Sequence, residues 1–111
     1  MSLYSGRELD KNQANFAPLT PVSVLKRTER VYPDLPAQIH GSIRRNWGEV
    51  AERCKLLASA LSKRGVGKGD TVALIAPNIP EALECALAIP MLGAVLNANN
   101  VRLDAATLGF I

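Results

Sequence analysis

The chain has 111 residues, of which 48% are apolar and 21% charged, and its formal net charge is +3. This length suits one small domain and is too short for two, and so high an apolar content excludes a disordered tail. The basic residues are mixed with acids and lack interleaved aromatic side chains, so we expect no nucleic-acid partner.

The first segment, residues 1–19, has no apolar periodicity and is expected to run extended over a surface. Thr20 can then cap a helix and Pro21 has a preset φ for its first position, which predicts a helix from Pro21 to about Val31. Its candidate inward-facing residues are Val22, Leu25 and Val24. We treat residues 20–111 as an incomplete domain that follows this segment.

A β-hairpin and a long helix are predicted next. Residues 37–40 and 43–45 are expected to form two short strands joined by the Gly41-Ser42 turn. Asn46 and Glu49 have the spacing of a capping box, which predicts a helix that continues to Arg64. Trp47 is expected to pack this helix against the hairpin rather than to stack on a ligand.

The stretch GVGKGDTVALIAPN, residues 65–78, has the composition of a phosphate-binding loop without its spacing. Ser62 and Gly69 stand where a P-loop needs Gly and Ser or Thr, and Asp70 stands where a dinucleotide loop needs its third glycine. Both loops lead from a strand into a helix, whereas apolar residues at three- and four-residue steps here place the helix first. Gly65 is therefore predicted to end that helix in a Schellman motif, as part of a connection to a strand at residues 71–76.

A second helix-forming pattern follows this strand. Asn78 and Glu81 are spaced as N-cap and N3 residues for a helix from Pro80 to Ile89, which Pro90 and Gly93 are expected to end. The helix is apolar almost all round, so it should be buried on more than one side.

The strand at residues 71–76 and a second one at residues 94–98 are both predicted to be buried on both faces. With the helix between them they form a βαβ unit of parallel strands, which should close right-handed. Asp104 is predicted to cap a last helix over residues 105–111.

Polar side chains follow both predicted strands, where ligands gather in open parallel sheets. One interpretation makes them a pocket wall, and the favoured one makes them helix caps and turn formers, with the arginine paired locally. None is a nucleophile or a general base, so we expect no catalytic, cofactor-binding or metal-binding residue in this chain. The residues concerned are Asn78, Asn97, Asn99, Asn100 and Arg102.

Other reactive groups are few. His40 is the single histidine, and no triad spacing surrounds it. Cys54 and Cys85 have no CxxC spacing and fit reduced core cysteines of a cytoplasmic protein. No signal peptide is evident in the polar first sixteen residues, and no apolar run reaches the ~20 residues of a membrane span.

Three stretches carry a resemblance to a known family: ANFAPLTPVSVLKR (14–27), RRNWGEVAERCKLLASALSKRGVGKGDTVALIAPNIPEAL (44–83) and IPMLGAVLNANNVRLDAATLGFI (89–111). They resemble the N-terminal part of acyl-CoA synthetases of the AMP-binding, adenylate-forming superfamily. The resemblance implies an α/β fold, a partial N-terminal subdomain with a β-hairpin and a parallel βαβ unit flanked by helices. Arg45-Asn46-Trp47 stands where the family usually has Tyr-Thr-Trp, and since Asn also caps helices this departure is expected to be harmless.

The resemblance also implies what a complete family member does. Such an enzyme forms an acyl-adenylate from a carboxylate and ATP with Mg²⁺ and then transfers the acyl group to coenzyme A, as in fatty acid metabolism. Its phosphate loop, ending in Pro-Lys-Gly, and its other catalytic segments do not occur here and would lie beyond Ile111. The chain is therefore expected to be an inactive, truncated fragment that binds no cofactor and whose partner is the remainder of its parent polypeptide or a second copy.

A different class of function remains open. The chain could be a non-catalytic α/β interaction module that dimerises or docks through its apolar segment at residues 80–92. A fragment should leave this segment exposed, whereas a module should bury it against a partner.

Overall fold

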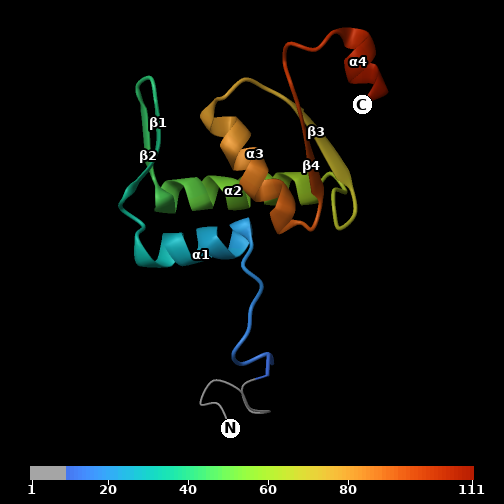
Figure 1. The fold of residues 1–111 in the computed structure, drawn as a ribbon. Helices are drawn as coiled ribbons and strands as arrows, with labels where there is room; N and C mark the ends of the chain where they lie inside the picture. The colour runs from blue at the N-terminus through green and yellow to red at the C-terminus, as the bar shows by residue number, and fades with distance from the viewer. Residues whose placement is uncertain (1–9) are drawn as a thin grey trace.

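The computed structural model describes residues 10–111 (Figure 1). Residues 10–19 are exposed and lie away from the helices, with a turn at 13–15, and the rest of the segment predicted to be extended, residues 1–9, lies outside the described residues. The elements, in chain order, are α1 (Pro21–Val31), β1 (Pro36–His40), β2 (Ile43–Asn46), α2 (Trp47–Ser62), β3 (Thr71–Ile75), α3 (Pro80–Met91), β4 (Val95–Asn99) and α4 (Ala105–Phe110).

Helix α1 begins as predicted. The Thr20 hydroxyl accepts a hydrogen bond from the Ser23 N–H at 3.0 Å, and the Ser23 hydroxyl accepts one from the Thr20 N–H at 2.8 Å. Leu25 is buried, whereas Val24 is 47% exposed, so the prediction that Val24 faces inward was wrong. The buried face of α1 is narrow, because it includes Leu25 but not the adjacent Val24.

The predicted hairpin and the cap of α2 are confirmed. Strands β1 and β2 pair antiparallel, with His40 opposite Ile43 across the turn. At the start of α2 the Asn46 side chain accepts from the Glu49 N–H at 2.8 Å, and the Glu49 carboxylate accepts from the Asn46 N–H at 2.8 Å. Trp47 is partly buried against the core, as expected.

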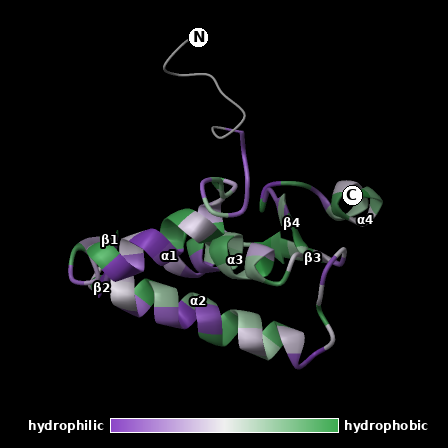
Figure 2. Ribbon diagram, turned by 90° about the horizontal axis from the view of Figure 1, so that it is seen from below, coloured by the Kyte–Doolittle hydropathy of each residue, from purple (hydrophilic) through white to green (hydrophobic). Residues whose placement is uncertain are grey.

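The core lies where α2 packs against α1 and α3 (Figure 1). Polar and apolar residues alternate along α2 in Figure 2, as they should in a helix with one face in the core. The buried side chains of this cluster are small for the most part: Leu25, Val50, Ala51, Cys54, Ala58 and Ala88. Small residues at a helix contact let the helices approach closely, and they leave a core of modest size.

The connection after α2 is the predicted one. Gly65 has φ +89°, and its N–H donates to the Ser62 carbonyl at 2.9 Å while that of Val66 donates to the Leu61 carbonyl at 3.1 Å. These two bonds make a Schellman ending, which satisfies carbonyls that the helix itself leaves free. The glycine-rich stretch therefore ends a helix and leads into β3.

Strands β3 and β4 pair in parallel, with Thr71 opposite Val95 and Ile75 opposite Asn99. Helix α3 connects them and packs on one side of the pair. The prediction that both strands are buried on two faces was wrong, because exposed and half-buried residues alternate along β3. Within residues 10–111 the second face has no cover.

Two details of α3 also differ from prediction. Its N-cap is Ile79, not Asn78, and no side chain caps it. Pro80 causes this, because a proline at the first helical position holds the residue before it in an extended conformation, here φ −119° and ψ 162°. The helix also runs past Pro90 to Met91, since a proline this close to the C-terminus removes only one helical hydrogen bond.

Helix α4 is short and is capped as predicted by Asp104. Its carboxylate accepts hydrogen bonds from the N–H and the hydroxyl of Thr107, both at 2.9 Å. The bond from the Thr107 N–H lowers the pKa of Asp104. Phe110 is 91% exposed and no residue of α4 is buried, so this helix is capped but does not pack against the rest of the described chain.

Candidate functional site

The carboxyl ends of β3 and β4 lie at the same edge of the parallel pair, beside α3. A cleft of about 590 Å³ opens there. Its apolar wall comes from the helix-facing side of the sheet and from α3: Leu74, Leu96, Ala98, Ala82 and Ala86. Its polar rim comes from the two segments that follow the strands, residues 76–78 and 99–102. The predicted place for a ligand is thus a real depression of the surface.

Four of the five polar residues named from the sequence line this cleft: Asn78, Asn99, Asn100 and Arg102. Asn97 is absent from the lining; it lies on the same face of β4 as Asn99 but two residues before the carboxyl end of the strand. The Asn99 amide donates to the Asn97 carbonyl at 3.2 Å, and the Asn100 side chain accepts from the Arg102 N–H at 2.9 Å. The interpretation of these asparagines as turn formers therefore holds for Asn100.

Arg102 and Asn78 are left with free polar groups. Within residues 10–111 the Arg102 guanidinium has no ion-pair partner, so the predicted local pairing involves its backbone only. The Asn78 side chain, released from the capping role, makes no hydrogen bond to another described residue. The cleft therefore offers one cation and amide groups, which can bind a polar or anionic molecule.

The groups that line the cleft do not fit a magnesium–ATP complex. Mg²⁺ prefers carboxylate oxygens, and the lining contains no Asp or Glu. No group of three or more His, Cys, Asp or Glu residues in the described part of the chain could hold a metal ion. The glycine-rich connector is no alternative, because the Gly67 N–H donates to the Asp70 carboxylate at 2.8 Å instead of facing a phosphate site.

The cysteines offer no activated nucleophile. Burial raises the pKa of the Cys54 thiol to about 11, and it also raises the pKa of Cys85. Both thiols are free, and neither lines the cleft. A raised pKa keeps a thiol protonated and inert at neutral pH, so Cys54 is a packing residue.

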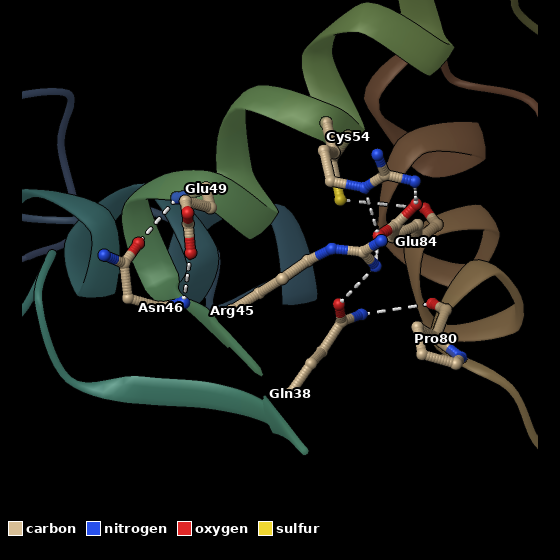
Figure 3. A network of polar contacts seen from close by, with 8 residues as sticks. Gln38, Arg45, Asn46, Glu49, Cys54, Pro80 and Glu84 are labelled. Atoms are coloured by element: carbon tan, nitrogen blue, oxygen red, sulfur yellow. Dashed lines mark hydrogen bonds and ion pairs between the residues drawn. The ribbon is translucent and has the colours of Figure 1, made fainter. Parts of the chain in front are cut away.

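A charge cluster around the buried Glu84 joins three elements (Figure 3). Glu84 of α3 has a side chain that is 5% exposed. Its carboxylate accepts from Arg45 Nη1 at 2.9 Å and from Arg53 Nε and Nη2 at 2.7 and 3.0 Å. The bond to Glu84 also raises the pKa of Arg53. The hairpin, α2 and α3 are thus fixed to one carboxylate.

Gln38 extends this cluster to the first residue of α3. Its amide donates to the Pro80 carbonyl at 3.1 Å, and its oxygen accepts from Arg45 at 3.1 Å. Figure 3 shows Gln38 between Arg45 and Pro80. The hairpin therefore holds the start of α3, next to the part of the loop that lines the cleft.

Sequence reasoning missed the cluster. Two signals were available: Glu84 is a carboxylate within an otherwise apolar helix face, and Arg45 replaces a tyrosine usual in the resembled family. The departure leaves the helix cap intact, as expected, because Asn46 caps α2, and Arg45 supplies one of the two cations that pair with Glu84.

Known proteins resemble this chain in sequence and in structure. A model of the family described as AMP-binding enzyme matches residues 25–111, well over half of the chain. The chain belongs to the AMP-binding enzyme family.

Relatives of this family member are named as ligases. It is 45% identical to acetate–CoA ligase CCL3 of Humulus lupulus over 109 residues, which is 96% of this chain and 19% of that protein. It is 47% identical to the peroxisomal acetate/butyrate–CoA ligase AAE7 of Arabidopsis thaliana over 104 residues, 94% of this chain and 18% of that protein. The chain thus spans less than a fifth of the length of these relatives.

Solved structures show the same arrangement. Klebsiella oxytoca NpsA, in complex with 3-hydroxyanthranilyl-AMSN, matches 81% of this AMP-binding chain and 18% of its own, with a TM-score of 0.77 and 28% identity. Bacillus subtilis O-succinylbenzoate coenzyme A synthetase, in complex with ATP and magnesium, matches 78% of this chain and 24% of its own, with a TM-score of 0.73 and 26% identity. The helices, hairpin and parallel strands described above are thus part of an N-terminal subdomain of adenylate-forming enzymes.

Proposed function

We propose that this chain is the N-terminal portion of an acid–CoA ligase that activates a carboxylate with ATP and then forms the CoA thioester. The observation that carries the proposal is the match of nearly the whole chain, at 45% and 47% identity, to two proteins named as CoA ligases of acetate or butyrate. The acid itself stays open, because relatives named for benzoate and cinnamate also match.

Within that enzyme the chain would act as scaffold. The lining of its cleft holds amides and one arginine, without a nucleophile, a general base or a carboxylate. ATP, Mg²⁺ and coenzyme A would then be bound by other parts of the parent, and the 111 residues alone would be inactive. Charge that develops on phosphoryl oxygens requires fixed donors and a metal ion, and no group of three or more His, Cys, Asp or Glu residues in the described part of the chain could hold that ion.

The competing proposal, a non-catalytic module that docks through residues 80–92, finds little free surface there. Ala88 and Ile89 are 0% and 1% exposed and pack inside this chain, and Leu83 is the large apolar residue of α3 that stays open, at 42%. This segment already serves as a connection within a βαβ unit. The expectation that a fragment would leave this segment exposed was therefore wrong, and the segment does not separate the two proposals. We favour the ligase because of the identity to proteins named as CoA ligases.

The test is an assay of the complete protein. The full coding sequence should be expressed and incubated with ATP, Mg²⁺, coenzyme A and a panel that contains acetate, butyrate, benzoate and cinnamate. We expect a CoA thioester of at least one acid, together with AMP, by mass spectrometry. If none of the panel forms either product, the relatives' activity does not extend to this protein.

The cellular location is a further proposal. We propose a cytoplasmic location because both cysteines are free, and thiols stay reduced in the cytosol. Five relatives are named as peroxisomal, which makes the peroxisome the alternative. No helix in residues 10–111 has the length and apolar composition to cross a membrane. Fluorescence microscopy of the tagged complete protein against a peroxisomal marker distinguishes the two.

A further inference from the structure

One rim of the cleft, residues 76–78, has few contacts that hold it in place. This rim segment lies between β3 and α3, outside helices and strands, and Pro77 and Asn78 are exposed. Inside residues 10–111 its hydrogen bond is a local one, from the Ile79 N–H to the Pro77 carbonyl at 2.8 Å. A second hollow, of about 350 Å³, lies between the hairpin and the start of α3, and Asn78 lines this hollow as well as the cleft. The position of the rim segment therefore depends on how its two ends are held.

The end of the rim segment at α3 is held by a side chain of the hairpin. Pro80 is buried at the first position of α3, and its carbonyl accepts the hydrogen bond from the Gln38 amide at 3.1 Å, across 42 positions of sequence. Gln38 is itself buried, and its amide oxygen accepts from Arg45 at 3.1 Å. With a donor and an acceptor both bonded, the Gln38 amide is held in one orientation (Figure 3).

A distortion of β1 directs Gln38 to this place. Pro36 and Gln38 lie opposite consecutive residues of β2, so Ala37 is an extra residue of β1. Such a bulge changes the direction of the side chains beside it. Gln38 and Arg45 lie directly opposite each other, hence on one face of the hairpin, and both side chains reach α3 from that face.

The charge cluster behind Gln38 is better suited to fixing an arrangement than to adding stability. A buried ion pair is often no more stabilising than apolar residues of the same volume, and its best supported use is to specify one geometry. The two arginines of the cluster differ in this respect. Both bond to Glu84, but within residues 10–111 Arg45 bonds to Gln38 and Arg53 does not.

We propose that Gln38 is a positioning residue of the complete enzyme. It holds the start of α3, and with it the rim segment, in one position relative to the hairpin, and it thereby sets how tightly a ligand binds in the cleft. Gln38 does not line the cleft, so it acts through the rim segment and not by contact with the ligand. The proposal rests on the proposed function in one respect, namely that this ligand is a substrate of the ligase.

The test compares three variants of the complete protein. Gln38→Glu keeps an acceptor for Arg45 and removes the donor to the Pro80 carbonyl. Gln38→Met removes both groups at similar length, and it serves as the second variant if the first fails to fold. Arg53→Met is the matched control, because it removes two hydrogen bonds to Glu84 and none to Gln38. A general loss of stability would affect this control at least as much as Gln38→Glu.

The first measurement is amide hydrogen exchange in the peptide that contains residues 76–79. We expect both Gln38 variants to exchange there about fivefold faster than the wild type, the effect of one lost hydrogen bond on local opening. Arg53→Met should exchange in this peptide at the wild-type rate.

The second measurement is steady-state kinetics with ATP, the acid and coenzyme A varied in turn. In both Gln38 variants the KM of at least one substrate should rise by about fivefold with kcat unchanged, because the rim acts on binding. Arg53→Met should keep every KM of the wild type.

The proposal is overturned by equal exchange in the wild type and both Gln38 variants, which would mean that Gln38 does not hold the rim segment. An equal change in Arg53→Met also overturns it, because the cluster would then act through stability alone. Faster exchange in the Gln38 variants without a change in any KM overturns it as well. A wild-type protein that converts none of the acids counts against the proposed function, and the exchange comparison then still decides whether Gln38 positions the rim.

Discussion

Replacing Glu84 by glutamine should cost more stability than any other single loss of charge in the described part of the chain. The carboxylate accepts three hydrogen bonds from Arg45 and Arg53 in a position where it is 5% exposed. The substitution keeps the shape of the side chain, but it removes the negative charge and places an NH₂ group against a guanidinium. The two arginines are then left without their counter-charge.

The expected loss in the free energy of unfolding depends on how well each arginine can be hydrated once the carboxylate is gone. Breaking a buried pair costs about 3–5 kcal/mol when a charge is left buried. The Arg53 side chain is 41% exposed and can be rehydrated, whereas that of Arg45 is 18% exposed and keeps only Gln38. We therefore expect a loss near the lower end of that range, about 3 kcal/mol in the free energy of unfolding.

The assay is equilibrium urea unfolding of the 111-residue chain, followed by far-UV circular dichroism. Glu29→Gln is the matched control, since Glu29 pairs with Lys55 through side chains that are 30% and 55% exposed. Exposed pairs contribute about 0–1 kcal/mol, so the control should shift the midpoint little. Equal losses in the two variants would refute the reasoning, because the cluster would then be no stronger than a surface pair.

Three further predictions concern the helix α2, the connector after it and the buried thiol. Leu57→Asp should abolish soluble expression of the complete protein, because Leu57 packs against the core cluster, and normal expression and melting would contradict this packing. Lys68→Ala should leave the ATP affinity of the complete protein unchanged in a calorimetric titration, since the connector ends a helix and does not begin one, and a large loss would restore the phosphate-loop interpretation. The raised pKa of Cys54, about 11, means that the unfolded chain loses its thiol proton first as pH rises. The contribution of the protonated Cys54 thiol to the free energy of unfolding is therefore complete below about pH 9 and is lost as the pH rises toward 11. Urea midpoints of the wild type should fall over this pH range, and Cys54→Ala should make that fall smaller.

The helix starts were predictable where one residue and its close neighbours decide them. Thr20, Asn46 and Asp104 all cap the helices assigned to them, because each cap needs only an oxygen two or three residues before the N–H it binds. Asn78 shows the limit of this rule. Pro80 at the first helical position moved the cap to Ile79, and the amide that looked like a cap became part of the cleft rim.

Interactions over long sequence distances were not predictable in the same way. Arg45 and Glu84 are 39 positions apart, and no local pattern links a β-strand residue to the middle of a helix. The cleft was placed correctly because the parallel pairing of two strands brings their carboxyl ends together by geometry alone. The bare face of the sheet was missed, since an apolar run predicts cover but not which polypeptide supplies it.

The central claim is that this chain is the scaffold part of an acid–CoA ligase whose catalytic residues lie elsewhere in its parent. The most direct measurement is carboxylate-dependent exchange of pyrophosphate into ATP, made on the complete protein and on the 111-residue chain at equal concentration. The account predicts exchange by the complete protein with at least one carboxylate and none by the chain alone. Exchange by the 111 residues, or none by the complete protein with any acid of the panel, would contradict it.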